Sequence, residues 1–240
     1  MARFSRGGVK VVPTTPAPAA LGARILAAID DGVEQRWGPA LRRAAAVEGD
    51  TVEARVDAVT SGFRQELGVA GAAAGGTSAI PGVGVATASA AFAVELAWST
   101  VRLTDLVLTI AALHGHRDAT IDERRLWVLT ILTFGDGATS MLTRLASDLG
   151  ATVGSQAAGR VPAETVRQLN KALGAKVVTR YGTRRGAIAV GRAIPFGIGA
   201  ALGYGLNSYT VKATARHANV FFADIPVREE SIPTTATDLG

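Results

Sequence analysis

The stretches AIPGVG at residues 79–84 and AIPFGIG at residues 193–199 decide how this chain folds, because each belongs to a long segment without charge. Residues 67–94 and 193–211 contain no Asp, Glu, Lys or Arg and consist mainly of small residues. Glycine destabilises a helix unless close packing compensates for it. Both segments are long enough to cross a bilayer, but Ala and Gly drive insertion less than Leu, Ile and Phe. They predict a membrane hairpin or closely packed helices, and the composition favours close packing.

The rest of the sequence predicts helices. Asp50 with Glu53, and Thr120 with Glu123, have the spacing of helix N-caps, and Pro162 stands where a first-turn proline belongs. No segment alternates apolar and polar residues between turn signals, so we expect no strands. The expected fold class is all-α, a multi-helix bundle with two long Gly/Ala-rich helices and disordered termini.

A single helical domain is expected over residues 21–224, since the 240-residue chain is long enough to bury a substantial core. Residues 1–20 are basic and rich in Pro and Thr, and residues 225–240 also carry prolines. Both segments predict disordered tails, and the first lacks the apolar stretch of a secretory signal peptide. The absence of cysteine excludes disulfides, thiolate catalysis and cysteine-ligated metal sites.

Most of the excess positive charge lies between residues 160 and 192, directly before the second uncharged segment. Anionic lipid headgroups attract such a block, and a solvated helix face is an equally weighted alternative. Nucleic-acid binding is not expected, because only 5% of the residues are aromatic and Tyr181 is the only aromatic residue in the basic block. The candidate membrane-surface residues are Arg167, Lys171, Lys176, Arg180, Arg184 and Arg185.

A polar stripe follows the first uncharged segment. Glu95 interrupts a stretch from residue 67 to 101 that is otherwise uncharged, and burying a lone carboxylate costs several kcal/mol. We therefore expect a partner for Glu95 on another helix, with Asn207 and His217 as candidates. A buried network that fixes the helix register is favoured over an ion, proton or ligand site. The residues of this predicted network are Glu95, Arg102, Asp105, Asn207 and His217.

Glycines in the uncharged segments have the spacing that lets two helix backbones approach closely. The stretch from Gly197 to Gly203 also resembles a dinucleotide-binding fingerprint, but no strand is expected before it, so we expect no cofactor. The candidate helix-packing residues are Gly82, Gly84, Gly197, Gly199 and Gly203.

His114 and His116 are weak candidates for a metal site, because no third ligand is defined beside them. We expect them to be a solvated helix terminus rather than metal ligands. The sequence contains no Gly-x-Ser-x-Gly, Walker A or His-Glu-x-x-His pattern, so no catalytic residue is assigned.

The order of these features resembles the EcsC family, bacterial proteins named for a gene encoded beside the subunits of an ABC transporter. The resemblance covers about residues 30 to 224. It implies a helical protein with a genetic link to a transporter, and it transfers no catalytic residue. His114-Gly115-His116 departs from the Tyr-Gly associated with this family. The matching stretches are IPGVG at 80–84, IAALHG at 110–115, DER at 122–124 and IPFGIGAALG at 194–203, followed by Asn207 and Phe221-Phe222.

The leading functional hypothesis is a cytoplasmic, non-enzymatic accessory or interaction protein, peripheral to or partly embedded in the inner face of the cell membrane. Its expected partners are anionic lipids and an ABC transporter or another membrane protein. A structural homo-oligomer packed through Gly199 and Gly203 is one alternative. The other is a soluble helical metal-dependent enzyme or ligand binder that uses Glu95, Asp105, His114, His116 and His217.

Overall fold

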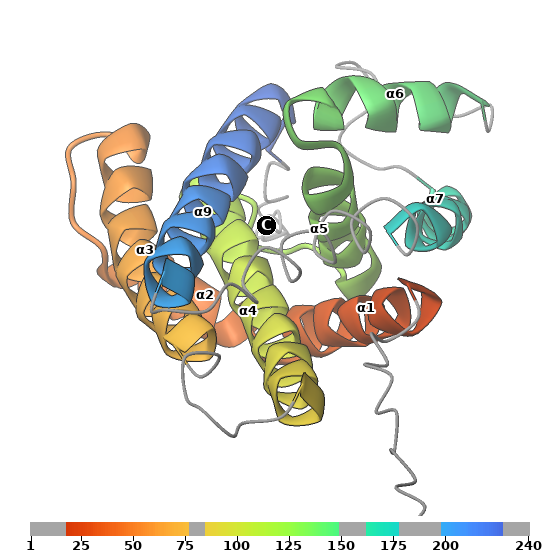
Figure 1. Ribbon diagram of the computed structural model, residues 1–240. Helices are drawn as coiled ribbons and strands as arrows, with labels where there is room; N and C mark the ends of the chain where they lie inside the picture. The colour runs from red at the N-terminus through yellow and green to blue at the C-terminus, as the bar shows by residue number, and fades with distance from the viewer. Residues whose placement is uncertain (1–17, 77–84, 149–161, 178–197, 228–240) are drawn as a thin grey trace, which may run out of the picture.

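The all-α prediction is confirmed over the residues that the computed structural model describes, which are 18–76, 85–148, 162–177 and 198–227. No strand occurs in these ranges, and the helices gather around α4 (Figure 1). The elements are α1 (Pro18–Gln35), α2 (Trp37–Ala46), α3 (Val52–Gly76), α4 (Val85–Leu113), α5 (Ile121–Phe134), the short 3-10 helix η2 (Gly135–Gly137), α6 (Ala138–Asp148), α7 (Ala163–Lys176) and α9 (Ile198–Asp224).

Helix α4 forms the centre of the core. Its side chains from Leu103 to Leu113 are all buried, and the helix packs against α1, α2, α3 and α9. Leu, Val, Ile and Ala occur on every side of this part of α4, which is the pattern of a helix surrounded by protein. Asp105 lies in the middle of this apolar stretch and is also fully buried.

The two uncharged segments are brought together at one end of the bundle. The first is divided, since residues 67–76 end α3 and α4 begins at Val85, while the second continues into α9. Helices α3 and α9 lie side by side and antiparallel, because Gly68 and Gly71 meet Ser208 and Gly203 respectively (Figure 1). The predicted packing residues Gly82, Gly84 and Gly197 lie outside the described residues.

Within the described ranges, two stretches are long and apolar enough to cross a membrane by length and composition alone. They are Val94–Leu113 and Ile121–Asp148, and 78% and 56% of the apolar 18-residue part of each is buried inside the protein. The second is not one straight helix, because Gly135 interrupts it with a φ of 59°. Residues 67–94 and 193–211 lie only partly within the described ranges. Core helices meet the same criteria, so these stretches are weak evidence for a span.

Local signals set several helix starts. The Thr120 capping box is confirmed, with the Thr120 and Glu123 side chains each bonded to the other's backbone N–H. The predicted Asp50 cap is wrong by one residue, because the Thr51 hydroxyl accepts the hydrogen bond from Ala54 N at 3.1 Å. Helix α7 begins at Ala163, so Pro162 is its N-cap, one residue before the first turn where it was predicted.

The predicted tails fall mainly outside the described residues. Helix α1 begins at Pro18, so the first helix extends into the predicted tail at residues 1–20. Residues 225–227 follow α9 without helical structure, and residues 1–17 and 228–240 are not described.

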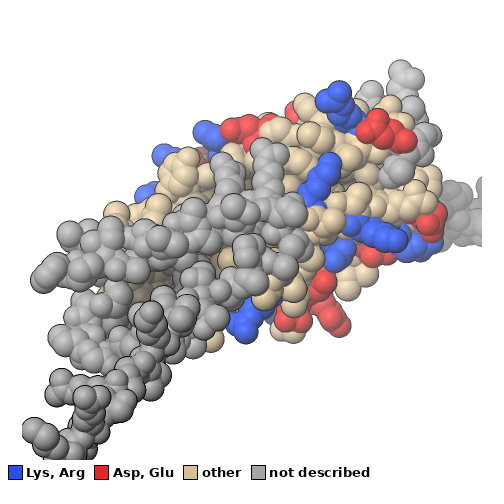
Figure 2. All heavy atoms as spheres, turned by 45° about the vertical axis from the view of Figure 1, so that its right-hand side comes forward, with Lys and Arg blue, Asp and Glu red and all other residues tan. Residues whose placement is uncertain are grey.

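The predicted membrane-surface residues on α7 are exposed. Arg167 bonds Glu164 at 2.6 Å, and the hydrogen bonds from Arg167 and Gln168 lower the pKa of the Glu164 carboxyl. Helix α7 packs against α5, away from α3 and α9 in Figure 1. Basic and acidic side chains are interspersed on the described part of the face in Figure 2. The described part of the block, with Lys171 and Lys176, therefore does not adjoin the end of the bundle where α3 and α9 bring the uncharged segments together. Arg180, Arg184 and Arg185 lie outside the described residues.

Candidate functional site

Three arginines surround the buried carboxylate of Asp105. Arg36, at the junction of α1 and α2, donates to Oδ2 from Nε at 3.0 Å and from Nη2 at 2.7 Å. Arg43 on α2 donates from Nη1 to Oδ1 at 2.6 Å, and Arg102 on α4 donates from Nη1 to Oδ2 at 2.5 Å. The side chain of Asp105 is 0% exposed, so this carboxylate joins α2 and the α1–α2 junction to the centre of the bundle.

The same cluster reaches α3 through a second carboxylate. Arg102 also donates to Glu66, whose side chain is 41% exposed. The guanidinium carbons of Arg43 and Arg102 lie 4.9 and 4.7 Å from the centroid of the Phe63 ring, within the range of cation–π attraction. With Asp105 and Glu66 as its acids and Arg36 as its third arginine, the cluster has one more positive charge than negative charges.

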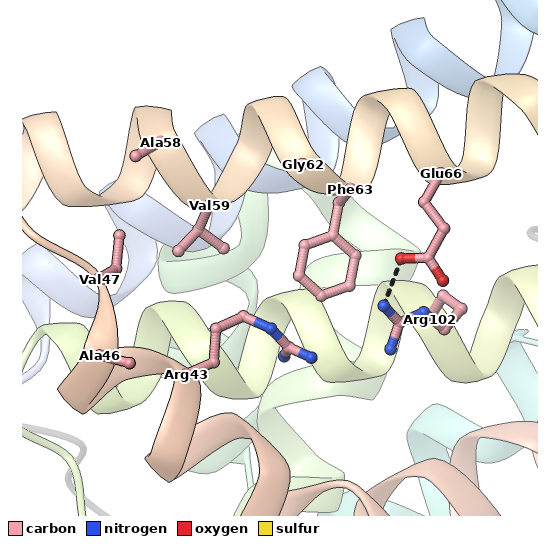
Figure 3. A pocket seen from close by; sticks show the side chains of 9 residues that line it. All are labelled: Arg43, Ala46, Val47, Ala58, Val59, Gly62, Phe63, Glu66 and Arg102. Carbon is pink, nitrogen blue, oxygen red and sulfur yellow. Dashed lines mark hydrogen bonds and ion pairs between the residues drawn. The ribbon is translucent and has the colours of Figure 1, made fainter.

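A groove of about 440 Å³ opens beside this cluster, between α2, α3 and α4. Arg43 and Arg102 extend toward one another below the Phe63 ring (Figure 3). The opposite end of the groove is apolar and is formed by Ala46, Val47, Ala58 and Val59, and Gly62 completes the lining beside Phe63. The groove is therefore amphipathic along its length.

The predicted network residues Glu95 and Asn207 lie in contact at the glycine-rich end. Asn207 donates from Nδ2 to Glu95 Oε1 at 3.0 Å and to the backbone carbonyl of Leu67 at 2.9 Å. These bonds join α9 to α4 and α3, and both polar side chains are buried. His217 does not belong to this group, because its ring lies against Gly135 and its Nε2 is 3.2 Å from Asp136 Oδ1. Arg102 and Asp105 belong to the arginine cluster instead.

Glycine pairing brings α3 and α9 into backbone contact. A Cβ atom added at Gly203 would lie 2.0 Å from the carbonyl oxygen of Gly71, and one added at Gly71 would lie 2.4 Å from that of Gly203. This face of Gly203 is occupied within the chain, so it is not available to a second copy. Gly199 lies in the first turn of α9. The homo-oligomer alternative loses its proposed contact at Gly203.

The residues of the metal-site alternative are not brought together. His114 Nε2 lies 2.8 Å from Asn219 Oδ1, and the buried His116 ring packs 5.5 Å from Trp127 and 5.3 Å from Phe222. Glu95 and Asp105 have the separate partners described above. In the described ranges no group of three or more His, Asp or Glu side chains could hold a metal ion.

Exposed large apolar side chains occur on α3, α4 and α9 within the uncharged segments or directly after them. Tyr209 and Val94 are 73% and 71% exposed there, and Glu95 is turned inward against Asn207. We call this surface the uncharged end; its exposed large side chains are Val69, Val94, Trp98, Leu202, Tyr204 and Tyr209.

The sequence does not single out four residues of the arginine cluster, Arg36, Arg43, Phe63 and Glu66. The one local signal is Asp105 itself, because a carboxylate within an apolar helix requires a cationic partner. The identity of that partner depends on how α1, α2 and α4 pack, which no spacing along the chain reveals.

No protein-family model, no curated protein and no solved structure matches this chain. Two features of the described residues bear on function, the uncharged end and the amphipathic groove.

Proposed function

We propose that this protein is a non-enzymatic, membrane-associated accessory protein whose uncharged end enters the cytoplasmic leaflet of the cell membrane. The observation that carries the proposal is the set of exposed apolar and aromatic side chains on the nearly uncharged parts of α3, α4 and α9. Trp and Tyr are enriched where proteins meet the membrane interface, and Trp98, Tyr204 and Tyr209 are exposed here.

The lengths of the helix ends support shallow insertion. Residues 67–76 of α3 and 198–211 of α9 carry no charge, and residues 85–101 of α4 carry only the buried Glu95. At the rise of an α-helix these parts are about 15 to 25 Å long. The hydrocarbon core is about 30 Å thick, so such ends reach into a bilayer without crossing it.

Membership of the EcsC family, and with it a role beside an ABC transporter or another membrane protein, belongs to the same proposal. Its support is the resemblance at residues 80–84, 110–115, 122–124 and 194–203. The basic block would add attraction to anionic headgroups. The described part of the block on α7 lies away from the uncharged end, so it would act on the protein's approach to the membrane rather than on insertion.

Flotation of the full chain with vesicles tests this proposal. The protein is expected to float with vesicles that contain anionic lipid and to remain partly bound at high salt, because apolar contact is not screened. Tyr209→Asp is expected to weaken vesicle binding by about tenfold, since it places a charge on the inserting surface.

Val220→Asp is the matched control for this experiment. Val220 is 49% exposed on the same helix, α9, but lies beyond the uncharged segment. Its substitution is expected to leave vesicle binding unchanged. A chain that never floats, or equal binding by Tyr209→Asp and the parent chain, would refute the proposal.

A further inference from the structure

The arginine cluster holds hydrogen-bond donors that the described protein does not use. Arg43 donates only through Nη1, to Asp105 and Thr109, so its Nε and Nη2 have no acceptor among the described residues. The Nε of Arg102 is buried and also lacks an acceptor there. Leaving the buried Nε of Arg102 without an acceptor costs free energy. Arg43 is 30% exposed and lines the groove, so its unused donors are open to water or to an oxyanion, the group that guanidinium donors bind best.

The charge of the cluster also favours an added anion. Among the described residues, Arg36, Arg43 and Arg102 pair with two acids, Asp105 and Glu66, which leaves one positive charge in excess. Glu66 is the more exposed of the two acids and holds Arg102 from the groove side of α3. It therefore competes with an incoming anion, whereas Asp105 positions the arginines from behind.

The shape of the groove limits what such an anion carries. Its volume of about 440 Å³ lies in the range of small-molecule sites. One end presents Arg43 and Arg102, and the other is lined by Val47, Ala58 and Val59. A purely polar anion would leave that apolar wall in water, and an uncharged apolar molecule would leave the arginine donors unpaired.

From this arrangement we infer that the groove binds an amphiphilic anion, a carboxylate or phosphate head on an apolar chain. The head accepts hydrogen bonds from Arg43 and Arg102 beside the Phe63 ring. The chain lies along α3 toward Val47 and Ala58. This inference is independent of the membrane proposal, because the groove and the uncharged end share no lining residue.

Titration calorimetry on the full chain provides the test. Decanoate and decyl phosphate, below the concentrations at which they form micelles, are the probes. At least one is expected to bind saturably with one site per chain. Decanol and inorganic phosphate are expected to bind at least about tenfold more weakly, since each lacks one half of the recognised group.

Two variants test separately how the charge of the groove and the shape of the groove contribute to binding. Arg43→Gln removes one of the two guanidiniums that bind the head group and is expected to weaken decanoate binding by about tenfold. Gly62→Leu fills the groove without touching Asp105, and a Cβ at Gly62 meets nothing within 4 Å, so the protein should fold. It is also expected to weaken binding about tenfold, whereas Gly205→Leu, an equally open position on α9, should leave binding unchanged.

Glu66→Gln gives a change of opposite sign. Without the competing carboxylate, decanoate is expected to bind about two- to fivefold more tightly. This gain would not follow from a groove that recognises only apolar chains.

A second experiment, with vesicles, distinguishes a free amphiphile from a lipid in a bilayer. Saturable binding of a soluble probe that Gly62→Leu weakens indicates a free amphiphile. Binding only to vesicles containing phosphatidate, weakened by Gly62→Leu and unchanged by Gly205→Leu, indicates a bilayer lipid; both results support the inference. It is overturned if Gly62→Leu changes neither interaction, or if decanol binds as tightly as decanoate. Tyr209→Asp is expected to lower vesicle binding while leaving decanoate binding intact, which keeps the two proposals separable.

Discussion

At the scale of single residues, Asp105 shows how one charge organises an apolar helix. It sits between Leu103 and Val107, both fully buried, and its two oxygens accept from three arginines. A buried charge that loses its counter-charge is costly, while the same pair replaced as a unit is not. Removing Asp105 alone, or the arginines alone, would therefore leave buried charge without a counter-charge.

Asp105→Asn is expected to lower the free energy of unfolding by about 3 kcal/mol, because three guanidiniums would then face a neutral amide. Urea denaturation followed by circular dichroism measures this change. Asp57→Asn serves as control, since Asp57 is exposed on α3, and it is expected to change stability by less than about 0.5 kcal/mol. Equal effects of the two substitutions would contradict a structural role for the Asp105 cluster.

Gly203→Ala is expected to destabilise the protein by about 2 to 3 kcal/mol, because the new methyl group would overlap the backbone of Gly71. Gly205→Ala, two residues further along α9, meets nothing within 4 Å and is expected to stabilise by about 0.5 to 1 kcal/mol. Thermal unfolding compares the pair. A Gly203→Ala protein as stable as Gly205→Ala would show that α3 and α9 do not pack this closely.

At the scale of elements, helix ends follow from nearby residues and helix partners do not. The Thr120 cap is predicted because Glu123 lies one turn away, and the error of one residue at Asp50 arises because Thr51 offers a second capping group. Helix α3 continues past Gly68 and Gly71 to Gly76, and those two glycines pack on α9. A helix of glycine and alanine gives no local sign of where it ends.

The capping box can be tested by Thr120→Ala, which removes the side-chain acceptor at the start of α5. The expected loss is about 1 kcal/mol in the free energy of unfolding. Thr143→Ala on the exposed face of α6 removes only a bond to the carbonyl of Thr139 and should cost nothing. Urea unfolding of both variants measures the difference. An unchanged midpoint for Thr120→Ala would show that the cap does not stabilise the protein.

The candidate site is less predictable than the fold, because its contacts join helices that are distant in sequence. The stripe with Glu95 and Asp105 is visible in the sequence as one helix face, yet its two ends belong to different groups: Glu95 meets Asn207, and Asp105 meets Arg36 and Arg43. These partners lie on helices distant in sequence, and several arrangements of the helices would satisfy either acid.

At the scale of the whole molecule, α4 is the element that the others share. Helices α1, α2, α3 and α9 all pack on it, and α5 also joins the same buried cluster. A core that every neighbour shares favours cooperative loss of structure.

Two single-tryptophan proteins are expected to unfold together. One keeps Trp37, which begins α2, and the other keeps Trp127 in α5. Their urea transitions, followed by fluorescence, should have the same midpoint as circular dichroism of each variant. Distinct midpoints within one variant would indicate that the helices form two cooperative units rather than one domain.

The contact between Gly71 and Gly203 also bears on how this chain can evolve. Each glycine leaves room only for the other's backbone, so a first substitution at either position is disfavoured even when a matching second one would be accepted. Stepwise substitution is thereby disfavoured at both positions, so the distance between α3 and α9 should be conserved as the sequence evolves. In distant homologues, these two positions should change together or not at all.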